Sequence, residues 1–100
     1  MSTELEVKTK VKPRAERPKL HKVILLNDDY TPRNFVTRVL QAVFRIGEDQ
    51  ASRIMYVAHT RGACVVSVYP KDVAETKATE AMDLAKEAGH PLQFTTEPEE

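Results

Sequence analysis

The sequence predicts a single α+β domain in which helices cover one face of a small sheet, with the elements in the order βααβαβ. Three observations support this fold class. A chain of 100 residues has room for one hydrophobic core. Three short runs of β-branched and apolar residues are bounded by turn-forming residues, as strands are. Three longer segments repeat apolar residues at helical spacing.

The first strand is expected over residues 20–27, where a short apolar run ends at two aspartates and a turn. The first helix is expected to start at Thr31 and Pro32, with the Thr31 hydroxyl as its cap and Pro32 as its first residue. Its apolar stripe consists of Phe35, Val36, Val39, Leu40, Val43 and Phe44. Gly47 is expected to end this helix in the left-handed conformation.

The second helix and the second strand follow directly. The helix is indicated by apolar residues at positions i, i+3, i+4 and i+7, which are Ala51, Ile54, Met55 and Ala58. Gly62 ends it, and residues 63–69 then form a β-branched run that stops at a proline. On this strand we expect Cys64 to share one face with Val66 and Val68, which favours a buried and unreactive thiol.

The third helix begins with Asp72 and Glu75 at capping-box spacing. A thin apolar stripe of small residues follows, made of Ala74, Ala78, Ala81, Ala85 and Ala88. Gly89 is expected to end the helix, and residues 92–95 form a last short strand after Pro91.

The two ends of the chain differ in composition from its middle. The net charge is zero, but residues 1–20 hold six basic and three acidic residues together with Pro13 and Pro18, which predicts a disordered N-terminal arm. An excess of three positive charges is too small to indicate nucleic-acid binding, where several phosphates must be neutralised. We expect an arm over residues 1–20, a folded core over 21–96 and an acidic end over 97–100.

No membrane segment and no secretory signal are predicted. No apolar run approaches the ~20 residues that cross a bilayer, and charges at Glu4, Glu6 and Lys8 interrupt the N-terminal segment. The single cysteine, Cys64, cannot form an intramolecular disulfide, which agrees with a reducing compartment. A cytoplasmic location is therefore expected.

Polar residues at the end of the first strand are the first candidates for a functional site. Asn27, Asp28 and Asp29 lie there, and His59, on the same helix face as Met55, can converge with them. Asp28 and His59 could form an acid/base pair, so a small acid/base enzyme is one interpretation. The sequence contains no nucleophile motif, phosphate loop or HExxH motif that would support it. A histidine near a helix C-terminus is also stabilised by the helix dipole.

Metal binding is the second possible function to consider from the sequence. The side chains that could supply ligands are His21, His59, His90 and Cys64. No two of them have the short spacing of structural zinc sites. Neither a metal nor a cofactor is therefore expected.

Four segments carry a resemblance to a known family, and it extends over residues 20–96. They are KVILLNDDYTPRNFV at 22–36, MYVAH at 55–59, VAETK at 73–77 and HPL at 90–92. In these segments the chain resembles the ClpS family, adaptors of the bacterial Clp protease. The resemblance implies a three-stranded antiparallel sheet with three helices. It also implies a non-enzymatic adaptor that binds a large hydrophobic N-terminal residue, the N-degron, and delivers the substrate to a ClpA-type AAA+ unfoldase and to ClpP.

The resemblance also implies which residues bind the N-degron, whose first residue would be Phe, Tyr, Trp or Leu. Asn27, Asp28 and His59 would bind its α-amino group. An amide oxygen, a carboxylate and a neutral imidazole nitrogen are acceptors, which suits an ammonium group with three donors. The hydrophobic pocket would be lined by Leu25, Thr31, Arg33, Val36, Met55, Ala58 and Leu92.

Two of these pocket positions depart from well-known relatives. Arg33 stands where they have a methionine at the rim, which helps to reject β-branched side chains. An arginine can lay its stem over an apolar site while its charge stays in water. Ala58 is smaller than the valine of some relatives, a change expected to widen the pocket for aromatic residues.

A second surface is implied on the third helix. The unfoldase interface would consist of Asp72, Glu75, Thr76 and Lys77, residues that a capping box and a solvated helix face would explain equally well. The resemblance gives residues 1–20 the role of a tether that the unfoldase engages. A further interpretation is a regulatory domain that binds the unfoldase without substrate specificity.

Overall fold

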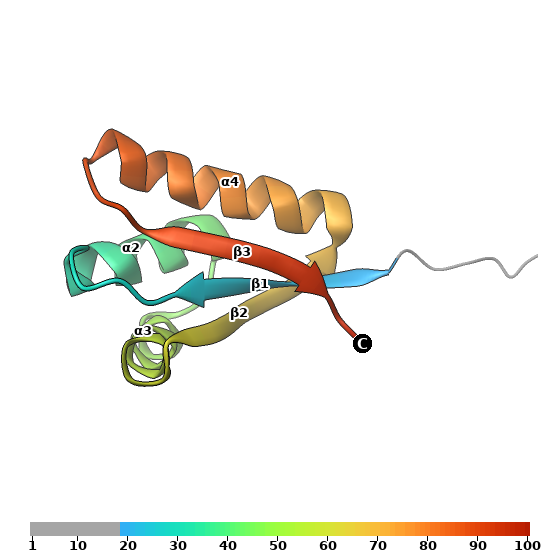
Figure 1. The fold of residues 1–100 in the computed structure, drawn as a ribbon, viewed down its shortest axis with the longest axis horizontal. Helices are drawn as coiled ribbons and strands as arrows, with labels where there is room; N and C mark the ends of the chain where they lie inside the picture. The colour runs from blue at the N-terminus through green and yellow to red at the C-terminus, as the bar shows by residue number, and fades with distance from the viewer. Residues whose placement is uncertain (1–18) are drawn as a thin grey trace, which may run out of the picture.

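The computed structural model describes residues 19–100, so the predicted disordered arm lies outside the described residues except for its last two positions. Along the chain lie β1 (Leu20–Leu26), α2 (Arg33–Phe44), α3 (Glu48–Arg61), β2 (Ala63–Pro70), α4 (Lys71–Glu87) and β3 (Gln93–Pro98). The predicted order βααβαβ is confirmed (Figure 1). No helix within residues 19–100 is long and apolar enough to cross a membrane.

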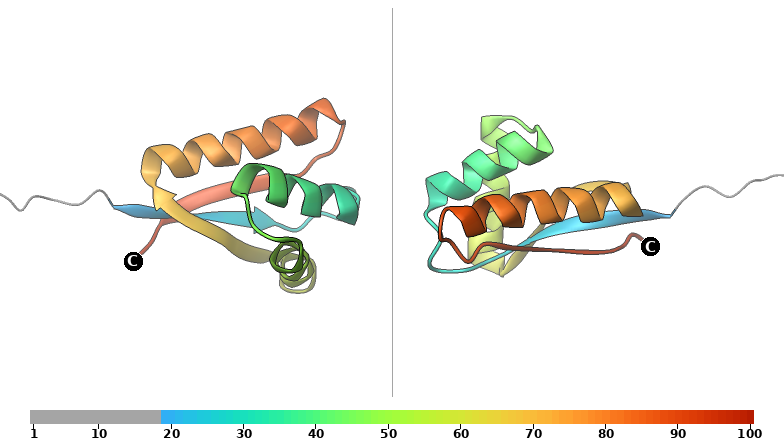
Figure 2. Two further views of the ribbon diagram at one scale, coloured as in Figure 1. Left: turned by 180° about the vertical axis from the view of Figure 1, so that it is seen from behind. Right: turned by 90° about the horizontal axis from the view of Figure 1, so that it is seen from above.

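The sheet has the strand order β2-β1-β3, and β1 pairs antiparallel with both neighbours. Because strand side chains alternate, Val23 and Leu25 of β1 face the helices while Ile24 faces away. The three helices cover one face of the sheet (Figure 2). The predicted α+β class and the antiparallel sheet implied by the resemblance are both confirmed.

The hydrophobic core fills the space between this sheet face and the helices. Leu25 of β1 and Leu40 of α2 are almost completely buried. Phe44 packs between Tyr69 and Phe94, with ring centroids 6.5 and 5.5 Å apart. The buried residues that α4 contributes to the core are all small, namely Ala74, Ala78, Ala81 and Ala85, and the half-buried Met82 packs against this core. The predicted stripe ends one member early, because Ala88 forms the C-cap and is exposed.

The start of α2 differs from the prediction. Pro32 occupies the N-cap position, and its carbonyl accepts hydrogen bonds from the N–H groups of Phe35 and Val36. The Thr31 hydroxyl makes no capping bond, because it donates to the carboxylate of Asp28 at 2.9 Å. The predicted Thr31 cap was therefore wrong, and the hydroxyl instead closes the loop that leads from β1 into α2.

The junction between α2 and α3 also differs from the prediction. Arg45, not Gly47, adopts the left-handed conformation that ends α2, with φ of 60°. Gly47 is extended, with φ of −75° and ψ of 166°, and it is the N-cap of α3. Ending α2 at Arg45 allows Ile46 to pack against the core, so burial of Ile46 outweighs the mild strain at Arg45. At the other end of α3, Gly62 is left-handed as predicted.

The prediction for α4 was wrong at its N-terminus and is confirmed at its C-terminus. Its N-cap is Pro70 and no side chain caps it, so the predicted capping box of Asp72 and Glu75 was wrong. Its C-terminus closes as predicted at Gly89, which has φ of 81°. The N–H of Gly89 bonds to the Lys86 carbonyl, and the next N–H bonds to the Ala85 carbonyl, which together form a Schellman motif. This turn brings the chain back toward the sheet just before β3.

The register of β2 corrects the expected orientation of its side chains. Val66 faces the core, but Val68 is 37% exposed and lies on the opposite face. A β-bulge opposite the Val23–Ile24 step inserts one residue into β2, and this reverses the alternation beyond it. Cys64 lies before the bulge and packs against the core, half-buried. Burial raises the pKa of the Cys64 thiol.

Candidate functional site

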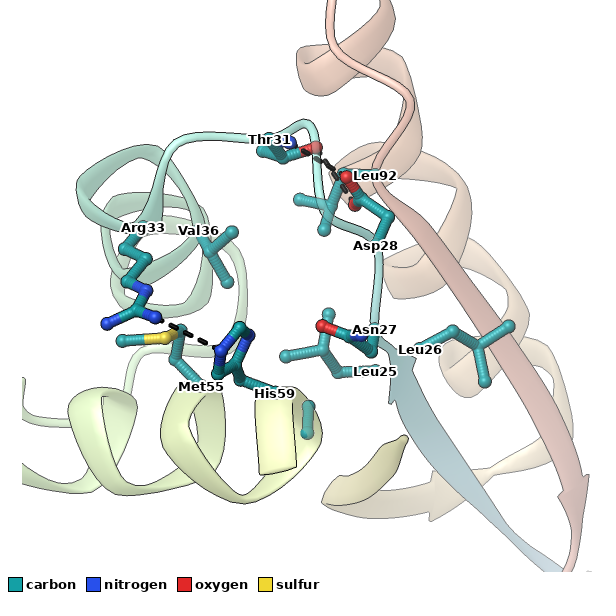
Figure 3. Close-up of a pocket in the computed structure, with 11 residues that line it drawn as sticks. Leu25, Leu26, Asn27, Asp28, Thr31, Arg33, Val36, Met55, His59 and Leu92 are labelled. Carbon is teal, nitrogen blue, oxygen red and sulfur yellow. Dashed lines mark hydrogen bonds between the residues drawn. The ribbon is translucent and has the colours of Figure 1, made fainter. Parts of the chain in front are cut away.

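A pocket opens where β1 ends, between the first turn of α2 and the middle of α3 (Figure 3). Its lining consists of Leu25, Leu26, Asn27, Asp28, Thr31, Arg33, Val36, Met55, Ala58, His59 and Leu92. All ten residues expected for the amine site and the hydrophobic pocket are therefore brought to one place. Leu26 was not expected there, and its side chain points away from the pocket, so only its backbone contributes.

The floor of the pocket is the end of the hydrophobic core. Leu25, Val36, Ala58 and Leu92 are buried and belong to the core cluster. Met55 is half-buried beside them, one helical turn before Ala58. Leu92 reaches the floor because the Schellman turn after α4 returns the chain to the sheet one residue before β3 begins. Segments far apart in the sequence thus form a single apolar surface.

The rim of the pocket on the β1 side is a loop that Asp28 organises. Its Oδ1 accepts hydrogen bonds from the N–H groups of Tyr30 (2.8 Å) and Thr31 (2.7 Å), and its Oδ2 accepts one from the Thr31 hydroxyl. The Asn27 N–H donates to the Gly62 carbonyl at 3.0 Å, which ties this loop to the end of α3. The Asn27 side chain is thereby held at the mouth, pointing toward the His59 ring (Figure 3).

On the opposite rim, Arg33 of α2 meets His59 of α3. The Arg33 Nη2 lies 3.1 Å from the His59 Nε2. A guanidinium group only donates hydrogen bonds, so Nε2 accepts and the ring proton resides on Nδ1. The sequence placed both residues at the site, but nothing in their spacing of 26 positions indicated that they bond to each other.

The residues expected at the unfoldase interface lie in the first two turns of α4. Asp72, Glu75 and Thr76 are exposed and line an open groove on the surface of this helix. Lys77 is half-buried, and its Nζ donates to the Val43 carbonyl at 2.9 Å. Lys77 therefore ties α4 to the end of α2, a structural contact that its sequence position did not reveal.

The histidines that were considered as possible metal ligands are dispersed. His21 is buried on β1, and its Nδ1 has no hydrogen-bond partner. His90 packs edge-on against Phe35, with ring centroids 4.7 Å apart. Within residues 19–100, no three His, Cys, Asp or Glu side chains form a group that could hold a metal ion.

Comparisons with known proteins place the chain in a class of protease adaptors. Residues 16–95 match the family described as "ATP-dependent Clp protease adaptor protein ClpS". The chain is 67% identical over 93 residues to the ClpS 2 adapter protein of Mesorhizobium japonicum, covering 93% of this chain and 92% of the relative. It is 66% identical over 97 residues to the ClpS 2 adapter protein of Agrobacterium fabrum, covering 97% and 94%.

A solved structure is similar over the described core. The structure of Agrobacterium tumefaciens ClpS2 bound to L-phenylalaninamide shares 67% sequence identity with a TM-score of 0.81. The match covers 83% of this chain and the whole of that chain. The chain belongs to the ClpS family, the adaptors of the ATP-dependent Clp protease.

Proposed function

We propose that this adaptor binds the free N-terminal residue of substrates in the pocket at the end of β1 and delivers them to a ClpA-type AAA+ unfoldase for degradation by ClpP. One observation carries the proposal: a single pocket combines an apolar floor with a rim of hydrogen-bond acceptors. The similar ClpS2 of Agrobacterium tumefaciens has been solved with L-phenylalaninamide, a ligand that pairs a free α-amine with a phenyl ring.

The proposed amine site consists of Asn27, Asp28 and His59. An α-ammonium group has three donors, and these side chains offer an amide oxygen, a carboxylate and an imidazole nitrogen. Each charge-assisted bond contributes about 1.5–3 kcal/mol. An acetylated N-terminus carries no charge and only one donor, so the proposed site rejects it.

The proposed side-chain site is the apolar floor, together with Thr31, Arg33 and Met55 at its edge. Burying a Phe or Leu side chain on Leu25, Val36, Ala58 and Leu92 contributes roughly 1.5–3 kcal/mol. Amine and side chain together approach the ~8 kcal/mol of a micromolar ligand. Phe, Tyr, Trp and Leu are therefore the proposed first residues, because they combine large apolar area with a free α-amine.

The contacts of Asp28 favour binding over the rival acid/base enzyme. Within residues 19–100 its carboxylate bonds to its own loop and makes no hydrogen bond to His59. An acid/base pair of an aspartate and a histidine needs the two side chains to bond to each other or to one reacting group between them. We therefore propose that the chain itself performs no catalysis, and that it acts in the cytoplasm, where the lone Cys64 thiol stays reduced.

For delivery we propose a second surface, made of Asp72, Glu75, Thr76 and Lys77 at the start of α4. Leu20 pairs with Pro70 at one end of β1, whereas Leu26 leads into the pocket at the other. Seven strand residues separate these ends by about 20 Å. Substrate and unfoldase could then be bound at the same time.

Fluorescence anisotropy with short peptides tests the proposal. Peptides that begin with Phe or Leu should bind, whereas peptides that begin with Ile or Arg, and an N-acetylated Phe peptide, should bind at least tenfold more weakly. Equal binding of the free and the acetylated Phe peptides would eliminate the amine site. Turnover of any peptide would support the acid/base enzyme, and binding to the unfoldase without peptide binding would support a regulatory domain.

A further inference from the structure

We propose that Arg33 is a specificity-determining latch: it closes the pocket by occupying the acceptor nitrogen of His59, and the α-amine of an N-degron opens it by taking that nitrogen over. This inference rests on the proposed function of the pocket. It concerns Arg33, which the resemblance placed at the rim of the pocket with no bonding partner named for its guanidinium group.

The first step is the geometry of the contact. Arg33 is the first residue of α2 and His59 lies in the last turn of α3, so their 3.1 Å hydrogen bond spans the mouth from one helix to the other (Figure 3). Both residues line the pocket. The bond therefore stands where a ligand has to enter.

The second step is that the His59 Nε2 can accept a strong hydrogen bond from only one donor at a time. A neutral imidazole has a single unprotonated nitrogen with one in-plane lone pair. Arg33 occupies that lone pair on Nε2, which leaves Nδ1 as a donor that repels an ammonium group. The bond from Arg33 to His59 and the bond from an α-ammonium to His59 are therefore mutually exclusive.

The third step is the size of the cavity. With the Arg33–His59 bond in place the pocket encloses about 30 Å³, which is room for one or two water molecules. A cavity that holds a benzene ring measures about 150 Å³. The pocket must expand before it admits an aromatic side chain, and the Arg33 stem, which lies beside Met55 at the mouth, is exposed and free to swing outward.

From these three steps it follows that the affinity for a ligand depends on the fraction of molecules in which the Arg33–His59 hydrogen bond is broken, which is the open state of the latch. The apparent dissociation constant of a ligand is its intrinsic value divided by the fraction that is competent to bind. A hydrogen bond of ordinary strength leaves between about a fifteenth and a third of the molecules open. Arg33 therefore weakens the apparent affinity of every ligand. Only a ligand that donates its own hydrogen bond to His59 regains the free energy that is lost.

The test compares two arginine-to-methionine variants in the full chain. Arg33→Met keeps an unbranched apolar stem but removes the donor. Arg38→Met makes the same change in charge at an exposed position of α2 outside the pocket. By anisotropy, the dissociation constant for a Phe-initiated peptide should tighten about threefold to fifteenfold in Arg33→Met, through faster association, and should stay within twofold in Arg38→Met.

A second measurement reports the latch without a ligand. Nitrogen-15 spectra of the histidine rings at about pH 8, where a histidine side chain is uncharged, distinguish a protonated from an unprotonated Nε2. In the unliganded protein the His59 Nε2 should be unprotonated. In Arg33→Met the ring should exchange between its two tautomers, because the donor that selects one of them is gone.

The outcomes separate the latch from the proposed function. If both proteins bind the Phe-initiated peptide and Arg33→Met binds equally or more weakly, the latch is overturned while the adaptor function stands. A protonated His59 Nε2 in the unliganded wild type also overturns the latch. If neither protein binds the peptide, the proposed function fails, and the latch fails with it.

Discussion

Asp28 illustrates how one side chain can serve a loop and a ligand site together. Three hydrogen bonds from Tyr30 and Thr31 fix its carboxylate, so its negative charge is held at the pocket rim before any ligand arrives. Fixing an acceptor in advance reduces the conformational entropy that is lost on binding. Substitutions of Asp28 are therefore expected to change the ligand affinity and the stability of the loop to different extents. The outcome depends on whether the new side chain retains the negative charge or only the hydrogen-bond acceptor.

We predict that Asp28→Ala weakens binding of a Phe-initiated peptide at least tenfold, because ~1.4 kcal/mol corresponds to one decade and a charged acceptor contributes more. Asp28→Ala should also lower the melting temperature, since Thr31 loses its acceptor. Asp28→Asn retains an oxygen for the two N–H groups, so it should lose affinity with a smaller change in melting temperature. Asp29→Ala, at the exposed neighbouring position, is the control. Unchanged affinity in Asp28→Asn would show that the charge plays no part.

The thiol of Cys64 gives a prediction about pH. Burial raises the pKa of this thiol, and the thiolate is the reactive form. At about pH 8, iodoacetamide should therefore modify Cys64 several-fold more slowly in the folded protein than in the urea-unfolded chain. The rate profile of the folded protein should rise at higher pH than that of the unfolded chain. Coincident profiles would contradict a raised pKa.

At the scale of elements, the backbone at helix ends decides which glycines matter. Gly89 has φ of 81°, in the left-handed region where a Cβ is strained, whereas Gly47 has φ of −75°. Neither position has another atom within 4 Å of the site of an added Cβ, so only the backbone distinguishes them. The two positions therefore form a matched pair for mutation.

We predict that Gly89→Ala lowers the free energy of unfolding by about 1 kcal/mol, because alanine disfavours the left-handed conformation. Gly47→Ala should lower it by less, a few tenths of a kcal/mol, since alanine adopts the extended conformation without strain but is a poorer N-cap than glycine. Urea denaturation measures both. A larger loss in Gly47→Ala than in Gly89→Ala would contradict the assignment of the two helix ends.

The same elements show what the sequence could predict. Periodicity and breakers located every helix and strand, since those signals are local. They failed at Gly47 and Val68, where burial of Ile46 and a β-bulge decided the local path of the chain. The pocket residues came from the resemblance, and their convergence depends on tertiary structure. The bond between Arg33 and His59 joins two helices, and no spacing along the chain encodes it.

At the scale of the whole molecule, the pocket and the start of α4 occupy opposite ends of the sheet. Leu20, where the described strand begins, pairs with Pro70 directly before α4. The described part of the chain therefore begins near the proposed unfoldase surface and away from the pocket. A deletion of residues 1–17 can therefore distinguish a role of this segment in delivery from a role in peptide binding.

We predict that deletion of residues 1–17 leaves the affinity for a Phe-initiated peptide within twofold, because β1 begins about 20 Å from the pocket. Degradation of an N-degron reporter by the Clp protease should nevertheless slow markedly, as expected for a tether. Normal degradation would reduce this segment to a tail that delivery does not need. A parallel loss of peptide affinity would instead make it part of the site.

The central position of β1 also determines how the domain bears a mechanical load. Its hydrogen bonds to β2 and β3 are perpendicular to the strand, so a force applied at Leu20 along the strand axis loads them all in shear at once. An edge strand pulled in the same direction would be held by hydrogen bonds to one neighbour only. Survival under such a force is governed by the rate of unfolding. A force applied at Leu20 along β1 is therefore opposed by both neighbouring strands at the same time.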